Sequence, residues 1–345
     1  MFLRPVGSAA ISTILLPIPH VRPFAGVITH SFTKDSVRRS SSLFSLGRDL
    51  NEVLAVAEDA ARKAGRIMID TTGEIDVLKH KSNVRDIVTA SDIACQKVIQ
   101  DVAQKRYPQD HFLGEESVGV GTEASVDALQ VALSSCQEED SLLWIVDPID
   151  GTTNFQSGLP VFCASIGIVN QQKEVVVAVV YNPVLDEMVT AIKGQGCFVN
   201  GRKLSTESGT NKAPIELQNS IVNIGFPVCK VETLMASSRA VTALSTKVKG
   251  LRMFACASQV MSWVAQKKIN AYISWNLNSW DICAGLLLVN EAGGFASSFD
   301  GKEATVETRD MIITCQGAHE NFGLSKNMLS EIIDVLQEAN CLDSY

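Results

Sequence analysis

Apolar residues recur at helical spacing in the first part of the chain and at strand spacing further on. Residues 50–68 place an apolar side chain every three or four positions, which predicts an amphipathic helix. A second helix is expected after Ser91 or Asp92, because either residue can act as its N-cap. Residues 112–113 indicate a short strand, and residues 126–133 indicate one further helix.

Four apolar runs in the middle of the chain predict strands at residues 142–146, 161–169, 175–181 and 188–192. The first is apolar throughout, as expected of a buried strand. Asn-Gln and Asn-Pro turn signals separate the last three runs, which favours an antiparallel meander. Tight turns containing glycine are expected next, at residues 194–196 and 200–201.

Strands alternate with helices in the second half, which residues 205–219 link to the first. The expected strands are 221–225, one near 251, 271–274, 295–299 and 311–314. The expected helices are 232–246, 258–266, 281–291 and 324–336. The whole pattern predicts an α/β protein with layered sheets between helices, divided into residues 49–204 and 205–345.

The first 48 residues differ from the rest of the chain in charge and composition. They are rich in Ser and carry six basic residues against one acid, Asp35, as organelle transit peptides do. We expect residues 1–48 to be a disordered presequence for a plastid or mitochondrion. The apolar stretch 9–18 also suits the core of a secretory signal, and a tail without an address would leave the protein in the cytoplasm.

The remaining body is acidic, with 24 basic and 37 acidic residues. A net charge of −13 argues against nucleic-acid binding, which needs a positive footprint. No segment after the first 48 residues predicts a membrane-spanning helix. The nine cysteines are scattered without a C-x-x-C pair, which predicts buried thiols in a reducing compartment and no zinc site.

Four acidic clusters stand where apolar segments meet turns or helix starts. They are Asp86–Asp92, Gly114–Ser117, Asp147–Thr152 and Trp280–Asp281. Carboxylates that converge from such places suit a hard divalent cation, because Mg²⁺ prefers oxygen ligands. The Gly-Thr-Thr-Asn segment after Asp150 adds hydroxyls and backbone N–H groups where an anion can sit. Metal ligands beside an anion site indicate phosphate chemistry.

The order and wording of these clusters resemble the inositol monophosphatase family of Mg²⁺-dependent, lithium-sensitive phosphatases. The similarity covers about residues 50–340, and four motifs in order are far more specific than one glycine pattern. The matching segments are DIVTASD (86–92), GEES (114–117), WIVDPIDGTTNF (144–155), WDICAG (280–285) and EAGG (291–294). The resemblance implies an αβαβα sandwich of the inositol monophosphatase/fructose-1,6-bisphosphatase type, with residues 49–345 as one catalytic unit and a homodimer.

The resemblance also implies a role for each matching residue. Two or three Mg²⁺ ions per subunit would be held by Glu115, Asp147, the carbonyl of Ile149, Asp150 and Asp281. Thr152 and Glu115 would position and deprotonate the attacking water, and Asp92 would hold outer-shell water or a third, weaker ion. Phosphate and substrate contacts are implied at Asp150, Gly151, Thr152, Ala257, Ser274 and Asp281.

Mg²⁺ suits the hydrolysis of a small phosphorylated metabolite. Phosphate monoesters hydrolyse extremely slowly in water, and a bound cation both activates water and stabilises the leaving oxygen. The expected reaction converts inositol 1-phosphate to inositol and phosphate. Histidinol phosphate, a sugar phosphate or a 3′,5′-bisphosphate nucleotide is the alternative substrate. A protein that binds metal and regulates without catalysing a reaction is the alternative from another functional class. The presence of all the expected metal-ligating acids disfavours this alternative.

Two departures from the family pattern concern the substrate. Where relatives acting on inositol phosphate carry a Gly-Thr-Ala segment, this chain has Ala255-Cys256-Ala257-Ser258, which lacks the threonine hydroxyl. Ser274 stands seven residues before Asp281. Those relatives place a glutamate at this position, which binds ring hydroxyls of the substrate. These changes leave the metal ligands intact, and they are the reason to keep the alternative substrates beside inositol 1-phosphate.

Overall fold

A computed structural model describes residues 48–73, 77–80, 87–136, 140–205, 215–226, 230–316 and 328–342. Of the predicted presequence, all but Arg48 lies outside these ranges, as does Asp86.

The larger of two mixed sheets has seven strands in the order β3-β4-β5-β6-β7-β8-β9. They span His111–Gly114, Leu143–Asp150, Cys163–Val169, Val175–Asn182, Glu187–Ile192, Gly196–Val199 and Arg202–Lys203. β3 and β4 are parallel and the other neighbours are antiparallel, which confirms the predicted meander. Only turns were expected at β8 and β9, and these two short strands extend the sheet.

The smaller sheet has five strands in the order β11-β10-β12-β14-β13. They span Gly250–Arg252, Ile221–Ile224, Ala271–Ser274, Met311–Thr314 and Phe295–Ser298, as the sequence predicted to within a residue or two. A separate pair, β1 (Val77–His80) and β2 (Ile87–Thr89), is antiparallel.

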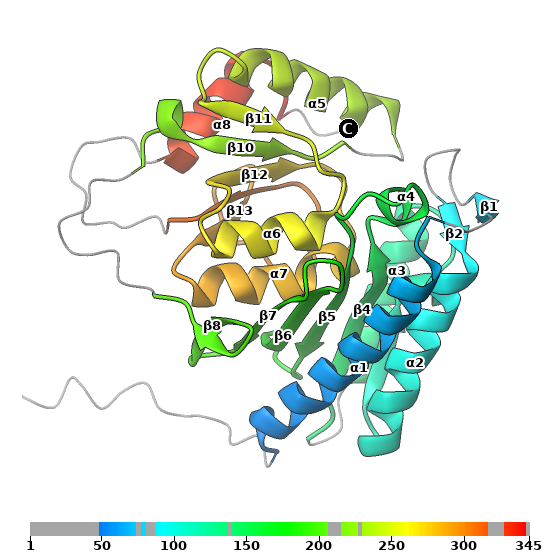
Figure 1. Cartoon of the computed structure of the whole chain (residues 1–345). Helices are drawn as coiled ribbons and strands as arrows, with labels where there is room; N and C mark the ends of the chain where they lie inside the picture. The colour runs from blue at the N-terminus through cyan, green and yellow to red at the C-terminus, as the bar shows by residue number, and fades with distance from the viewer. Residues whose placement is uncertain are drawn as a thin grey trace, which may run out of the picture. The chain divides into compact units, whose positions relative to one another are not determined.

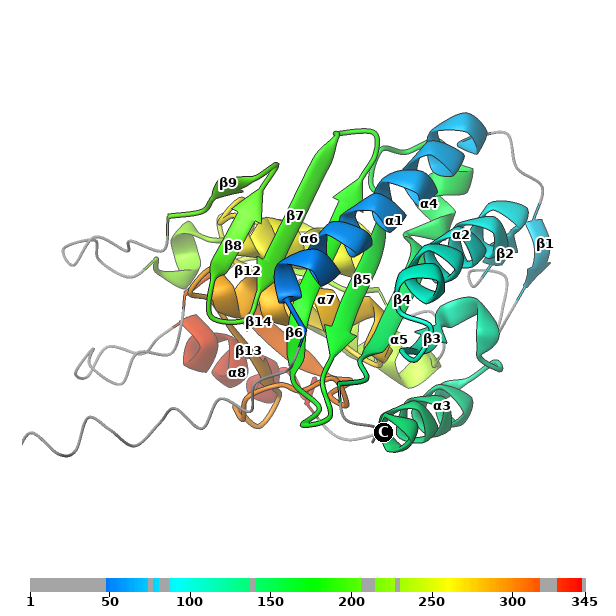
Figure 2. The ribbon, with the colours of Figure 1, turned by 90° about the horizontal axis from the view of Figure 1, so that it is seen from below.

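Helices cover both sheets and fill the space between them (Figure 1). α1 (Leu50–Thr71) and α2 (Ala90–Arg106) pack on the outer face of the large sheet, as Figure 2 also shows. α6 (Ala257–Ala265) and α7 (Ser279–Glu291) lie between the sheets, and α5 (Val231–Leu244) and α8 (Met328–Glu338) cover the small sheet. The predicted αβαβα sandwich is confirmed.

The sequence of each helix suits its layer. α7 is apolar on nearly every side, as a helix between two sheets must be. α1 lines its inner face with small residues, and an added Cβ at Gly65 would lie 2.5 Å from the Tyr181 ring. Within the described residues, no helix is both long and apolar enough to cross a membrane.

Four further elements complete the described chain. The excursion after β3 holds the 3₁₀ turn η1 (Glu115–Ser117) and α3 (Thr122–Ser135), which is longer at both ends than the predicted helix. α4 (Thr152–Gln156) follows β4, and η2 (Leu217–Asn219) precedes β10.

The N-caps of α2 and α7 each hold an aspartate in the first turn of the helix. Thr89, and not Ser91 or Asp92, is the N-cap of α2, and Asp92 occupies the third helical position. Asn278 is the N-cap of α7, and Asp281 is its third helical residue. Both aspartates accept hydrogen bonds from the backbone N–H of the cap residue, at 2.8 and 2.7 Å. Each capping box thereby fixes an acid at a helix start.

Arg48 ties the start of α1 to the large sheet. Its guanidinium donates to both oxygens of Asp110, at 2.7 and 2.9 Å, and lies over the Tyr107 ring. Asp110 also accepts from the indole N–H of Trp144 and the backbone N–H of Leu142, at 2.8 and 3.2 Å. Arg48 therefore belongs to the folded unit although it closes the predicted presequence.

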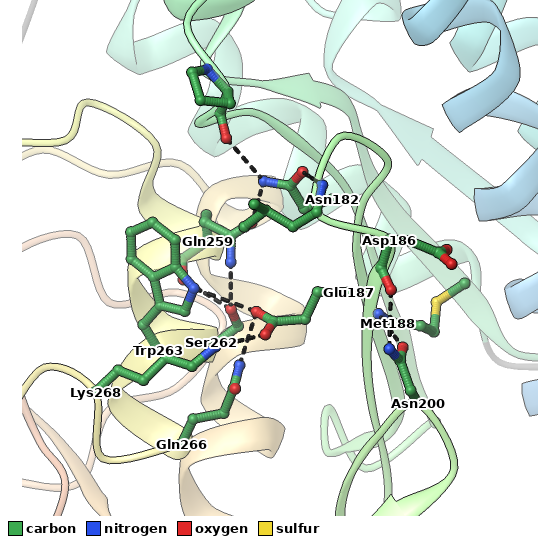
Figure 3. Close-up of polar contacts among 12 residues, drawn as sticks. Asn182, Asp186, Glu187, Met188, Asn200, Gln259, Ser262, Trp263, Gln266 and Lys268 are labelled. Atoms are coloured by element: carbon green, nitrogen blue, oxygen red, sulfur yellow. Dashed lines mark hydrogen bonds and ion pairs between the residues drawn. The ribbon is translucent and has the colours of Figure 1, made fainter.

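A polar network fixes α6 against the meander (Figure 3). The buried amides of Asn182 and Gln259 meet at 2.9 Å, and Gln259 also donates to Ser262. Near the other end of α6, Trp263 donates its indole N–H to Glu187 at 3.2 Å. Contacts at both ends reduce the freedom of α6, whose first turn reaches the candidate site.

Candidate functional site

A β-bulge brings Asp147 and Asp150 together at the end of β4. Side chains three positions apart on a regular strand point to opposite faces of the sheet. Here Asp147 pairs with Ser165 and Asp150 with Cys163, so β4 has one residue more than β5 between these pairs. The extra residue turns Asp150 to the side of Asp147. Both carboxylates are buried, with exposed fractions of 3% and 7%.

Strand register places Glu115 beside this pair. β3 runs parallel to β4 with Gly114 opposite Val146, so Glu115 follows at the level of Asp147. The backbone of Glu116 donates to Gln96 of α2 at 2.8 Å, which anchors the 3₁₀ turn. The charge of Glu115 raises the pKa of Asp147, Asp150 and Asp281.

Asp281 joins the cluster from the first turn of α7. Its side chain is half-buried and accepts from the cap residue Asn278. Its carbonyl accepts from the Ser258 hydroxyl at 3.0 Å, which links α7 to α6. Arg309 holds the cap in turn, donating to the side chain of Asn278 at 3.0 Å.

Burial is the largest electrostatic effect on the cluster, and repulsion between its carboxylates adds to it. Burial, followed by the charges of Glu115, Asp150 and Asp281, raises the pKa of Asp147 well above its usual value. Burial raises the pKa of Asp150 to about 6, although backbone N–H groups oppose the shift. Burial and the charges of Asp150 and Glu115 also raise the pKa of Asp281. An all-oxygen donor set that repels itself fits a hard divalent cation, which would neutralise it.

Asp92 and Thr152 form a second polar group next to the bulge. The Thr152 hydroxyl lies 3.3 Å from Asp92 Oδ1 and 3.0 Å from the carbonyl oxygen of Ile149. Asp92 is buried and also accepts from the backbone and hydroxyl of Thr89. The predicted residues Asp92, Ile149 and Thr152 are therefore brought together by α2, β4 and α4.

Gly151 joins β4 to α4 in a conformation that favours glycine. Its φ is +87°, and an added Cβ would lie 2.8 Å from the carbonyl oxygen of Val161. The absence of a side chain allows the chain to turn directly from Asp150 into α4.

The first turn of α6 holds Asp150 through its backbone. Ala257 and Ser258 donate their N–H groups to the two Asp150 oxygens, at 3.2 and 2.5 Å. Ala257 was predicted to contact substrate, and the contact observed is with this carboxylate. The role of Ser258 was missed, because a backbone N–H leaves no sequence signal. Ala255, just before the turn, has the left-handed φ of +52°.

Ser274 ends β12 in a buried position with an exposed fraction of 2%. Its hydroxyl oxygen would lie 2.1 Å from a Cβ added to Gly225. Ser274 also hydrogen-bonds the buried Tyr272, whose pKa is raised by burial and by the charges of Asp150 and Asp281. Substrate contact at Ser274 stays a prediction.

The five-layer fold and its carboxylate cluster define an α/β protein of the inositol monophosphatase/fructose-1,6-bisphosphatase fold type. The model of the inositol monophosphatase family matches residues 49–330. The chain belongs to the inositol monophosphatase family, as its four motifs predicted.

Relatives with different names are similar to the chain. It is 32% identical to inositol monophosphatase 3 of Solanum lycopersicum over 77% of this chain and 92% of the relative. It is 33% identical to Nus factor SuhB of Haemophilus influenzae over 76% of this chain and 91% of the relative. Among solved structures, the extragenic suppressor protein SuhB of Bartonella henselae has a TM-score of 0.68 at 28% identity. The similarity covers 83% of this chain and 99% of that structure's chain.

Proposed function

We propose that residues 49–345 form one catalytic unit that hydrolyses a small phosphorylated metabolite in the presence of Mg²⁺. The convergence of Glu115, Asp147, Asp150 and Asp281 carries the proposal, since burial and like-charged neighbours raise the pKa of all three aspartates. Members of this family are metal-dependent, which agrees with the donor set.

The proposed metal ligands are Glu115, Asp147, Asp150, Asp281 and the carbonyl oxygen of Ile149, for two or three ions. Bound Mg²⁺ lowers the pKa of a ligated water and stabilises negative charge on phosphate oxygens. The bulge supports this set, because it gathers Asp147 and Asp150 without a rearrangement of the backbone. The N–H groups of Ala257 and Ser258 hold Asp150 in one orientation, which lowers the entropy lost on binding.

The attacking water would be positioned by Thr152 with Glu115 and Asp92. The Thr152 hydroxyl can donate to Asp92 or to the Ile149 carbonyl, so its oxygen lone pairs are free to accept a proton of the water. Glu115 would take the proton as general base. The backbone N–H groups of Gly151 and Thr152 would bind the phosphate at the start of α4.

Inositol 1-phosphate is the first candidate substrate, because inositol monophosphatases are among the relatives. Ser274 and Cys256 favour a different preference, since neither supplies the groups that the family pattern places there. Histidinol phosphate, galactose 1-phosphate and adenosine 3′,5′-bisphosphate are the alternatives to compare.

Phosphate release tests the proposal directly. The protein should begin at residue 46, so that Arg48 keeps its contacts with Asp110. We expect release that requires Mg²⁺ and that Asp147→Asn abolishes, whereas Asp101→Asn, at an exposed ion pair on α2, changes little. Inhibition by Li⁺ is a further expectation from the family resemblance. Mg²⁺ binding without release from any candidate would instead establish a non-catalytic regulator.

The remaining expectations concern partners and location. We propose a homodimer, which sedimentation would test, and no binding to nucleic acid, which a mobility shift with RNA would contradict. We also propose that residues 1–48 direct the protein to a plastid or mitochondrion. A reporter fused to these residues that stays in the cytoplasm would overturn this assignment.

A further inference from the structure

Two cysteine sulfurs meet beside Asp150. Cys163 lies on β5 opposite Asp150 in the strand register, and Cys256 is the residue before α6. Their Sγ atoms are 3.8 Å apart, and both side chains are buried. The Cys256 thiol also donates to the carbonyl oxygen of Asp150 at 3.3 Å.

The three side chains together form a set of metal donors. An Asp150 oxygen and the two sulfur atoms all lie within 4.8 Å of one another. Among the residues that the structure describes, this is the one such group of three His, Cys, Asp or Glu side chains. The other described cysteines lack this arrangement, so the group is a local feature of β5, α6 and the bulge.

The sulfur separation suits a tetrahedral thiolate site. With Zn–S bonds of about 2.3 Å and tetrahedral angles, two sulfur ligands stand about 3.8 Å apart. The observed 3.8 Å therefore needs no closing movement. A disulfide would need a separation of about 2.0 Å, so the same sulfurs would have to approach substantially.

We propose that Asp150, Cys163 and Cys256 form a site for a thiophilic divalent cation of the Zn²⁺ or Cd²⁺ class. Thiolates favour such soft or borderline cations, whereas Mg²⁺ prefers oxygen donors alone. Binding would release the two thiol protons to solvent, and water would complete the coordination. Because Asp150 is shared, the soft cation would compete with Mg²⁺, and trace Zn²⁺ would inhibit turnover. This one consequence rests on the proposed function.

Cadmium titration provides a readout that is independent of activity. Metal-free protein, kept reduced with a phosphine, is titrated with Cd²⁺ while the ultraviolet thiolate-to-cadmium charge-transfer band is followed. We expect the band to saturate at one equivalent and to disappear when Zn²⁺ displaces the Cd²⁺. Loss of at least tenfold in Cd²⁺ affinity is expected for Cys163→Ser and Cys256→Ser, and Cys136→Ser should match the parent. Cys136 is a suitable control because its thiol is also buried and already has a polar neighbour, Ser141.

Three outcomes would overturn the site. They are no band at one equivalent, a band that survives both substitutions, or equal loss in Cys136→Ser. Circular dichroism and a second variant, Cys256→Thr, separate loss of a sulfur ligand from loss of folding. A protein that gives the band but releases no phosphate would retain this site and refute the phosphatase. Phosphate release without the band would support the phosphatase and refute this cation site.

Discussion

Neutralising Asp147 should stabilise the metal-free protein above pH 6. Its carboxylate accepts a hydrogen bond from the backbone of Ile149 at 3.1 Å, which the oxygen of an asparagine can also accept. Asp147→Asn therefore removes a buried charge, and its repulsion with Glu115, Asp150 and Asp281, while keeping size and hydrogen bonding. Most substitutions of buried polar residues destabilise, so the expected sign is distinctive.

Asp150 sets the scale of the effect. Burial raises its pKa to about 6 from a usual value of 3.8, so the folded state binds this proton more tightly than the unfolded state does. Its contribution to stability is complete below pH 4 and is lost as the pH rises through about 6, a decline of roughly 3 kcal/mol. Asp147, whose pKa is raised in the same direction, should add a further decline that Asp147→Asn removes.

Urea unfolding at pH 4.5 and 7.5, with EDTA or with excess Mg²⁺, measures this difference. In EDTA at pH 7.5 we expect Asp147→Asn to unfold at a higher urea concentration than wild type. Mg²⁺ should stabilise wild type and have little effect on the variant. Asp101→Asn serves as the exposed control. A variant that is less stable than wild type in EDTA at pH 7.5 would refute the electrostatic reasoning.

Three further substitutions test separate features. Arg48→Ala should lower the free energy of unfolding in urea by about 3 kcal/mol, because it leaves the buried Asp110 without its cationic partner. Arg106→Ala, which removes an exposed ion pair, should lower it by less than about 1 kcal/mol. Equal losses would contradict a stabilising role for the Arg48–Asp110 pair. Ala255→Gly should add about 0.5–1 kcal/mol by relieving a φ of +52°, and a lower melting temperature would contradict this. Thr152→Val should lower kcat by roughly 100-fold or more with an unchanged melting temperature, while Thr152→Ser retains most activity.

The sequence predicted the layered fold because hydrophobic periodicity records burial on one face or two. The apolar run of β4 and the long helix α1 were evident for this reason. β9 was missed because two residues are too few for a periodic signal, and β8 was missed because it begins at Gly196, within a predicted turn. The cap of α2 was misplaced, although a Thr three residues before an acid is a capping-box pattern.

The acids of the candidate site were identifiable because they follow apolar segments within ordered motifs. Their geometry was not predictable, since it depends on pairings between distant segments. The bulge at Asp150 is visible only in the register of β4 against β5, and the proximity of Cys163 to Cys256 joins two different layers. Ser274 illustrates the same limit, because position in a motif does not reveal that its hydroxyl faces Gly225.

The carboxylate cluster also has a consequence for the order of folding. Its members come from η1, β4 and α7, so the complete site exists only after α7 has docked between the two sheets. Contacts that form after the folding barrier has been crossed slow unfolding and leave the folding rate unchanged. A cation held there should slow unfolding and leave the folding rate unchanged. A cation bound at this cluster would then lengthen the lifetime of each folded molecule.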